Sequence, residues 1–204
     1  MRGRLRRARA GVTSIPGEAD YNGDPSSFSR TYMATFGHLA AAALIARLAT
    51  RPEDSRLQRI QRLAGASAWA VAPDLDLALR LVGVPRGNGV LSHRGASHAV
   101  ILGPLVTLAL IGLDHDPRDA ACFGAALASH GIIDMLSDTE RGPAIAWPFS
   151  RDRFVFPWRP VPSIPFSERT RGSRRQIRAL LSELVLFGPV AVLAFWPAAH
   201  RNRT

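Results

Sequence analysis

The stretch AVILGPLVTLALIGLDHDPRDAACFGAALASHGIIDM, residues 99–135, decides how this chain folds. It contains two apolar runs, residues 99–113 and 120–135, joined by the polar connector 114–119. Pro117 in the connector ends one helix and permits a tight reversal. We therefore expect an antiparallel helix pair, in which positions whose numbers sum to about 233 lie level with each other.

Two motifs at the ends of these runs, SHRGASH and SHGIID, hold three of the chain's six histidines. His130 and Asp134 are four residues apart, so both side chains leave the same face of a helix about one turn apart. In the expected pairing His98 lies level with Asp134, and His93 approaches from the same end. This arrangement suits one metal ion or a tight pair of ions.

Three more polar residues are candidates for the same end. Asp74 and Asp76 lie in the motif APDLD, where Pro73 interrupts a helical pattern, and carboxylates at such a break can turn inward together. His38 opens another apolar helix. Carboxylate and imidazole together are typical of zinc, manganese or iron hydrolytic sites, and the set exceeds the needs of one tetrahedral ion.

Each motif also has a simpler interpretation. A single His-x-x-x-Asp on a helix is also typical of a buried imidazole bonded to its carboxylate. SHRGASH also fits a helix start, with Ser92 or Ser97 as the cap and Gly95 at the bend, which leaves the two histidines unexplained. APDLD also fits a Pro-Asp turn. We expect no chemical role for His115 or His200, which lie in the connector and the tail.

The order of these motifs resembles the YdjM-like inner-membrane proteins, a family expected to contain membrane-bound metal-dependent hydrolases. HRGASH, then SHGIIDMLSD, then WPFSRDRF carry the resemblance, which covers roughly residues 33–156. Through that family the chain is distantly similar to zinc-dependent phospholipases C and related single-strand nucleases. The resemblance implies a metal site and hydrolysis of a phosphoester or other ester or amide, whereas the substrate, a small molecule or a lipid, stays open.

We therefore expect an all-α, membrane-associated antiparallel bundle with a divalent metal, zinc before manganese or iron, at one end of the helices. Asp74 or Asp76 would serve as ligand, bridging carboxylate or general base. Arg94 would hold a substrate phosphate, or form a structural salt bridge to Asp138 or another acid. Asp138 would hydrogen-bond to a metal ligand and so fix the orientation of that ligand. The expected ligands are His38, His93, His98, His130 and Asp134.

The chain divides into three parts. Residues 1–32 are rich in Gly, Ser and Arg without helical or strand periodicity, so we expect a disordered basic extension, or a stretch upstream of a true start at Met33. No apolar region of the kind that a signal peptide needs follows directly. Residues 33–199 form the expected single helical domain, and residues 200–204 a basic tail.

Composition narrows the partners. All 26 basic residues are arginine, which fits codon bias as well as an anionic partner, and no RNA-binding motif appears, so we expect no nucleic acid. The single Cys122 excludes an intrachain disulfide. A non-catalytic membrane scaffold with a structural metal or a hydrogen-bonded His/Asp cluster is the alternative function. A third is a nucleic-acid or anionic-lipid binder that uses the basic extension.

Membrane topology is open from length alone, because each apolar run is shorter than the roughly 20 residues of a spanning helix. Arginines are dense in residues 51–94 and 141–178 but not in the acidic connector. The positive-inside rule then places the metal site at the cytoplasmic face of the inner membrane. The proline-rich, aromatic segment 141–175 predicts an ordered loop in the headgroup zone, a lid, or a linker.

Overall fold

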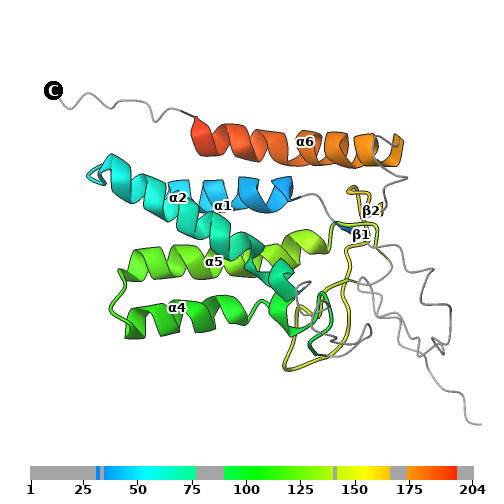
Figure 1. Cartoon of the computed structure of the whole chain (residues 1–204), viewed down its shortest axis with the longest axis horizontal. Coiled ribbons are helices and arrows are strands. Elements are labelled where there is room, and N and C mark those ends of the chain that lie inside the picture. Colours follow the sequence, from blue (N-terminus) through cyan, green and yellow to red (C-terminus); the bar gives the residue numbers. More distant parts are fainter. Residues whose placement is uncertain (1–30, 33–34, 77–89, 140–141, 166–173, 197–204) are drawn as a thin grey trace, which may run out of the picture.

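The computed structural model describes residues 31–32, 35–76, 90–139, 142–165 and 174–196. Among these residues the chain forms five α-helices and a single pair of two-residue strands, which confirms the predicted all-α bundle (Figure 1). The helices are α1 (Phe36–Ala49), α2 (Arg56–Val71), α4 (Leu102–Gly112), α5 (Pro117–Asp134) and α6 (Arg174–Phe195). Two 3-10 turns, η2 (Ala72–Leu75) and η4 (Ala96–His98), precede or follow them, and β1 (Thr31–Tyr32) pairs antiparallel with β2 (Ile164–Pro165).

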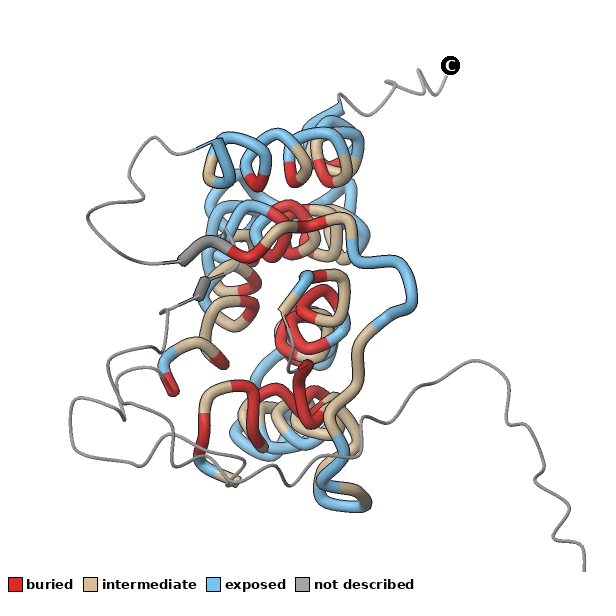
Figure 2. Tube along the Cα trace, turned by 90° about the vertical axis from the view of Figure 1, so that its right-hand side faces the viewer, coloured by how far each residue is buried: buried red, intermediate tan, exposed pale blue. Residues whose placement is uncertain are grey.

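The helix axes run roughly side by side, with α6 along one edge of the bundle, α4 along the other and the remaining helices between them (Figure 1). Buried residues face the middle of the bundle, whereas α6 is largely exposed (Figure 2). Small side chains fill the contact between α1, α2 and α5, which lets the backbones approach closely, as in membrane helix bundles. These buried residues are Ala42, Ala46, Ala66, Ala70, Cys122 and Ala126.

The predicted helix pair is present as α4 and α5, but in a different register. Gly103 faces Gly124, where a Cβ on either residue would collide with the partner's backbone, and the Thr107 hydroxyl lies 3.3 Å from the Ala120 carbonyl oxygen. α4 ends earlier than the apolar run, since residues 113–116 belong to the turn. The carbonyl of His98 therefore packs on Gly131, about one turn before Asp134.

Local signals explain where two of the helices begin. The Ser55 hydroxyl caps α2 by accepting from the Gln58 backbone N–H, and the Gln58 side-chain oxygen accepts from the Ser55 backbone N–H. The two hydrogen bonds form a complete capping box. Asp116 caps α5 by accepting from the N–H groups of Arg118 and Asp119 directly after the turn.

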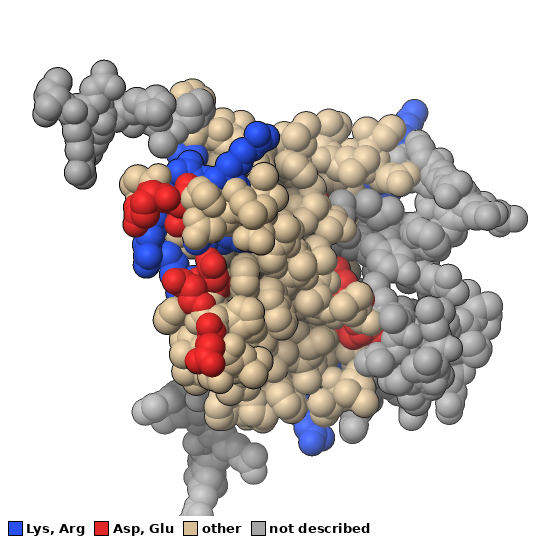
Figure 3. Space-filling view, turned by 60° about the vertical axis from the view of Figure 1, so that its left-hand side comes forward, with Lys and Arg blue, Asp and Glu red and all other residues tan. Residues whose placement is uncertain are grey.

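The two ends of the bundle differ in charge. We call the end with the α1–α2 turn and the residue 113–116 turn the connector end, and the opposite one the site end. At the connector end Arg62 donates to Asp54 and Asp119, and acidic and basic side chains gather there while the sides of the helices carry few of either (Figure 3). The prediction that the arginines of residues 51–94 lie together at the end opposite the acidic connector is therefore wrong. α2 runs the full length of the bundle and brings Arg62 to the connector end.

Candidate metal centre

Four separate segments meet at the site end. The start of α1 supplies His38, η2 supplies Asp74, η4 supplies His98, and the last turn of α5 supplies His130 and Asp134. Pro73 turns the end of α2 into η2, as the helix-breaking pattern predicts. The absence of a side chain on Gly131 lets η4 lie directly on α5, since a Cβ there would collide with the His98 carbonyl oxygen.

Four ligand atoms from these segments surround one point. His98 Nε2 lies 3.3 Å from Asp134 Oδ2 and 3.7 Å from Asp74 Oδ1. His130 Nε2 lies 3.8 Å from Asp134 Oδ2 and 3.5 Å from Asp74 Oδ1. Ligand atoms at zinc's usual bond lengths in a tetrahedron are about 3.3 to 3.6 Å apart. The four His–Asp distances in this four-ligand set, His98, His130, Asp74 and Asp134, lie within that range or about 0.2 Å above it.

Three atoms of the four-ligand set are buried without a hydrogen bond among the described residues: His98 Nε2, His130 Nε2 and Asp134 Oδ2. A buried polar atom left without a partner costs about 1 to 3 kcal/mol. Three such atoms facing one another, with carboxylate beside imidazole, match the donors that a divalent cation takes. The residues present thus fit a metal ion.

The orientation of His130 is fixed by a backbone group. Its Nδ1 lies 2.6 Å from the Ala70 carbonyl oxygen on α2. Because a carbonyl oxygen only accepts, Nδ1 carries the proton and the lone pair of the neutral ring is on Nε2, which faces the four-ligand set.

The orientation of His98 follows from a chain of two hydrogen bonds. The Ser97 hydroxyl donates to Asp76 Oδ2 over 2.7 Å, and His98 Nδ1 lies 2.9 Å from the same hydroxyl oxygen. Since the only hydroxyl proton of Ser97 goes to the carboxylate, His98 Nδ1 is the donor to Ser97. Its Nε2 is then left to face Asp134 and Asp74.

Asp76 holds the HRGASH loop together. Besides Ser97, it accepts from the Arg94 backbone N–H at 3.2 Å and from His93 Nδ1 at 2.7 Å. His93 lies outside the four-ligand set, packs edge-on against His98 with ring centroids 5.5 Å apart, and is in metal-binding reach only with Asp76 and His98. Asp74 and Asp76 therefore differ in position: Asp74 faces the histidines of α5 and η4, and Asp76 lies behind the loop.

Asp134 lies at the centre of the cluster. Its Oδ1 is 3.6 Å from His38 Nε2, and its Oδ2 is 3.2 Å from Arg94 Nε. The ring of His38 stacks on that of His130 with centroids 3.9 Å apart. His38, His130 and Asp134 form a second group within reach of one ion, so the cluster offers donors for a second ion beside the first.

The charges at the site end shift two groups in opposite directions. Burial alone would raise the pKa of the Asp74 carboxyl, but the neighbouring imidazoles of His130 and His98 hold it well below its usual value. Burial alone would lower the pKa of His98, but the neighbouring carboxylates of Asp134 and Asp74 raise it to about 9. Without an ion, a proton on His98 thus balances part of the carboxylate charge.

The acid that pairs with Arg94 is Asp134. Arg94 is buried, pairs with Asp134, and donates to Ser137 and Thr139. Asp138 instead accepts from the Ser163 backbone N–H at 2.6 Å and pairs with Arg175 at 3.2 Å. The expected link between Arg94 and an acid is made to Asp134, and the contacts of Asp138 with Ser163 and Arg175 tie the chain after α5 to α6.

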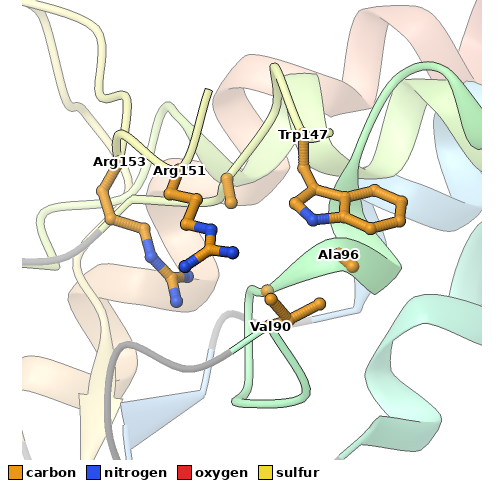
Figure 4. Close-up of a pocket in the computed structure, with 7 residues that line it drawn as sticks. Val90, Ala96, Trp147, Arg151 and Arg153 are labelled. Atoms are coloured by element: carbon orange, nitrogen blue, oxygen red, sulfur yellow. The ribbon is translucent and has the colours of Figure 1, made fainter. Parts of the chain in front are cut away.

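Arg153 is a residue that the sequence analysis did not single out, although it lies in the quoted motif WPFSRDRF. It donates to the carbonyl oxygen of Arg94 and, at 2.8 Å, to the Ser92 hydroxyl, where Arg94 has a φ of 62°. With Trp147 and Arg151 it lines a small pocket beside the loop (Figure 4). None of the four-ligand set lines this pocket, so Arg153 supports the loop from outside.

Comparison with known proteins places the chain beside inner membrane proteins. Residues 33–200 match the profile of the family described as YdjM inner membrane protein. The chain is 27% identical over 122 residues to the Inner membrane protein YbcI of Escherichia coli (strain K12), an alignment that covers 57% of this chain and 70% of the relative. No solved structure matches the chain significantly.

Proposed function

The chain belongs to the YdjM family of inner membrane proteins, and from that premise we propose that it is a membrane-bound, metal-dependent hydrolase. The observation that carries the proposal is the four-ligand set, in which imidazole nitrogens lie 3.3 to 3.8 Å from carboxylate oxygens. Two histidines and a carboxylate with a further oxygen ligand are the donors that catalytic zinc sites use.

Each residue has a role in this proposal. His98, His130, Asp74 and Asp134 hold a divalent ion, with zinc favoured by the donor chemistry, and His38 beside Asp134 is the donor toward a second ion. When bound, such an ion lowers the pKa of a coordinated water and polarises the oxygen of an ester or phosphoester. Arg94 neutralises part of the Asp134 charge, which places a fixed cation beside the reaction centre.

The proton transfers fall to His93. Asp76 fixes its Nδ1, which leaves Nε2 to accept a proton, as in other His-Asp pairs. The oxygen of water bonds to the phosphorus or carbonyl carbon while one proton passes to His93. The bond from that atom to the ester oxygen breaks, and His93 returns the proton to the leaving oxygen. This assignment replaces a ligand role for His93, and metal content of His93→Gln separates the two.

The experiment is metal analysis of the purified full chain, followed by a panel of phosphoesters and carboxylic esters with and without chelator. We expect about one to two ions per chain and hydrolysis that stops with chelator and returns with zinc. Asp134→Asn should lose metal and activity, whereas Asp152→Asn, an exposed site-end control, should keep both. A wild-type chain that binds metal tightly but hydrolyses nothing in the panel contradicts the proposal.

One observation favours a catalytic site over a closed structural one. Most ligand side chains are buried, but the Asp74 side chain is 37% exposed. A structural site is closed by four protein ligands, whereas a hydrolytic site keeps a position for water. Exchange of Asp74 for water opens such a position on the exposed side.

We orient the site end toward the cytoplasm. α6 carries Arg174, Arg175 and Arg178 in its first turns and no basic residue in its last turn, and the arginine-rich flank of a span stays in the cytoplasm. In a Cys122→Ala background, Asp152→Cys at the site end should react with an impermeant maleimide only after the inner membrane is opened. His115→Cys at the connector end should react in intact spheroplasts, and the reverse pattern would invert the orientation.

A further inference from the structure

The helix α6 is the reference for depth in the membrane. Within the described part of the chain it is the helix long and apolar enough to cross a bilayer, with 22 residues; α1 and α4 are apolar but shorter. α6 lies along the edge of the bundle (Figure 1) and exposes many of its large apolar side chains, and burying each in lipid is worth about 1.5 to 3 kcal/mol. The exposed set includes Leu180, Leu181, Leu184, Val185, Val192 and Leu193.

Two contacts fix the height of α1 against α6. The Gly37 backbone N–H donates to Glu183 at 3.3 Å, and Arg47 donates to the Ala194 carbonyl oxygen at 3.4 Å. From the first contact to the second, the chain moves forward along both helices by a similar number of residues, so α1 and α6 run parallel and side by side. The candidate ligand that follows Gly37 in the chain, His38, therefore lies at the depth of Glu183.

In a bilayer that α6 spans, that depth is inside the hydrocarbon layer. Arg178 is the last arginine at the start of α6, and five residues of helix separate it from Glu183, which is about 8 Å at 1.5 Å per residue. From Arg178 to Trp196 the helix rises about 27 Å, close to the roughly 30 Å of a bilayer core. The four-ligand set, which contacts His38 through Asp134, thus lies several ångström below the headgroups.

Exposed apolar side chains lie close in sequence to the exposed ligand Asp74. Asp74 is the ligand with the most exposed side chain, and the next residue, Leu75, is 69% exposed. Leu91, just before the HRGASH loop, is 63% exposed. A site that draws a charged substrate from water is usually rimmed by polar or cationic groups, whereas exposed leucines beside a ligand suit a hydrocarbon neighbour.

We propose that the metal centre opens into the outer hydrocarbon layer of the bilayer, so that its substrate is a membrane amphiphile cleaved at an ester or phosphoester linkage near its headgroup. The inference rests on the proposed hydrolase for the reaction, but the position of the opening stands on the geometry alone. A lipid presents that linkage at the depth of the four-ligand set without leaving the bilayer. A water-soluble ester would have to enter the apolar layer to reach it.

The first arm of the test measures depth and needs no activity. The full chain in nanodiscs, in a Cys122→Ala background, carries a bimane label at Leu75→Cys, with Val185→Cys as the lipid control and Asp152→Cys as the water control. We expect Leu75 to follow Val185, with strong quenching by lipids brominated near the headgroup and little quenching by iodide. Quenching of Leu75 by iodide to the extent seen for Asp152 overturns the inference.

The second arm compares two phosphodiesters on the zinc-loaded chain: phosphatidylglycerol in the nanodisc and water-soluble bis(p-nitrophenyl) phosphate. We expect hydrolysis of the first and none of the second. Hydrolysis of the soluble ester alone overturns the inference and leaves the hydrolase standing. Hydrolysis of neither, by a zinc-loaded chain whose Leu75 label is quenched from the lipid, contradicts the hydrolase and leaves the opening toward the bilayer supported.

Discussion

Replacing Asp76 by asparagine removes the group that fixes both histidines of the HRGASH loop. The carboxylate accepts from His93 Nδ1 and the Ser97 hydroxyl, each at 2.7 Å, and from the Arg94 N–H at 3.2 Å. The amide of an asparagine has one accepting oxygen, so its NH₂ group must face a donor on one side. Either His93 or Ser97 then loses its partner, and His98 is no longer held with Nε2 toward the ion.

Because Asp76 lies behind the loop rather than in the four-ligand set, the expected loss is that of an orienting partner. Such losses are about 10- to 100-fold in metal affinity, or about 1.4 to 2.7 kcal/mol. The assay is competition for zinc against a fluorescent chelator on detergent-solubilised chain, with a monodisperse size-exclusion peak as the check on folding. Asp152→Asn serves as the matched control. An Asp76→Asn chain whose affinity stays within twofold of wild type refutes the reasoning.

Three further outcomes follow from the same geometry. His130→Ala should lose most of the bound metal, while His115→Ala in the exposed turn should lose none; equal losses would point to general instability. Metal uptake should release about one proton per ion at pH 7, because the pKa of His98 is raised to about 9 in the metal-free chain. Metal affinity should therefore rise with pH up to about 9 and then level off. Calorimetry in buffers of different ionisation enthalpy would measure the proton release. Removal of residues 1–30, a stretch without apolar periodicity, should leave melting temperature and metal affinity unchanged, whereas lower expression or lost metal would assign that stretch a structural role.

Much of the fold was accessible from the sequence because helix-period apolar runs and proline breaks are local signals. The α4–α5 pair and the meeting of His98 with the end of α5 follow from them. The register does not, since it depends on how many residues the turn consumes. The place of Arg62 was also missed, because its two acidic partners come from segments far apart in the chain.

The candidate site, too, could be predicted from the sequence only in part. Residue types and spacings single out the histidines and aspartates, but not which aspartate faces the ligands and which lies behind them. The Ala70 carbonyl that orients His130 has no side-chain signature, so no pattern can indicate it. Ser97 was visible only as a helix-capping residue, and its link between Asp76 and His98 required the backbone path of the loop.

The origin of the four ligands in separate segments has a consequence for biogenesis. Asp74 and His98 are synthesised before His130 and Asp134, so a partial chain that ends before Asp134 cannot hold an ion in the full set. In the proposed metal centre, loading therefore follows the synthesis of α5, and a bound ion would tie η2, η4 and α5 to one another. Metal supply would then act as a maturation step, because an ion that binds only the folded chain stabilises that chain against unfolding.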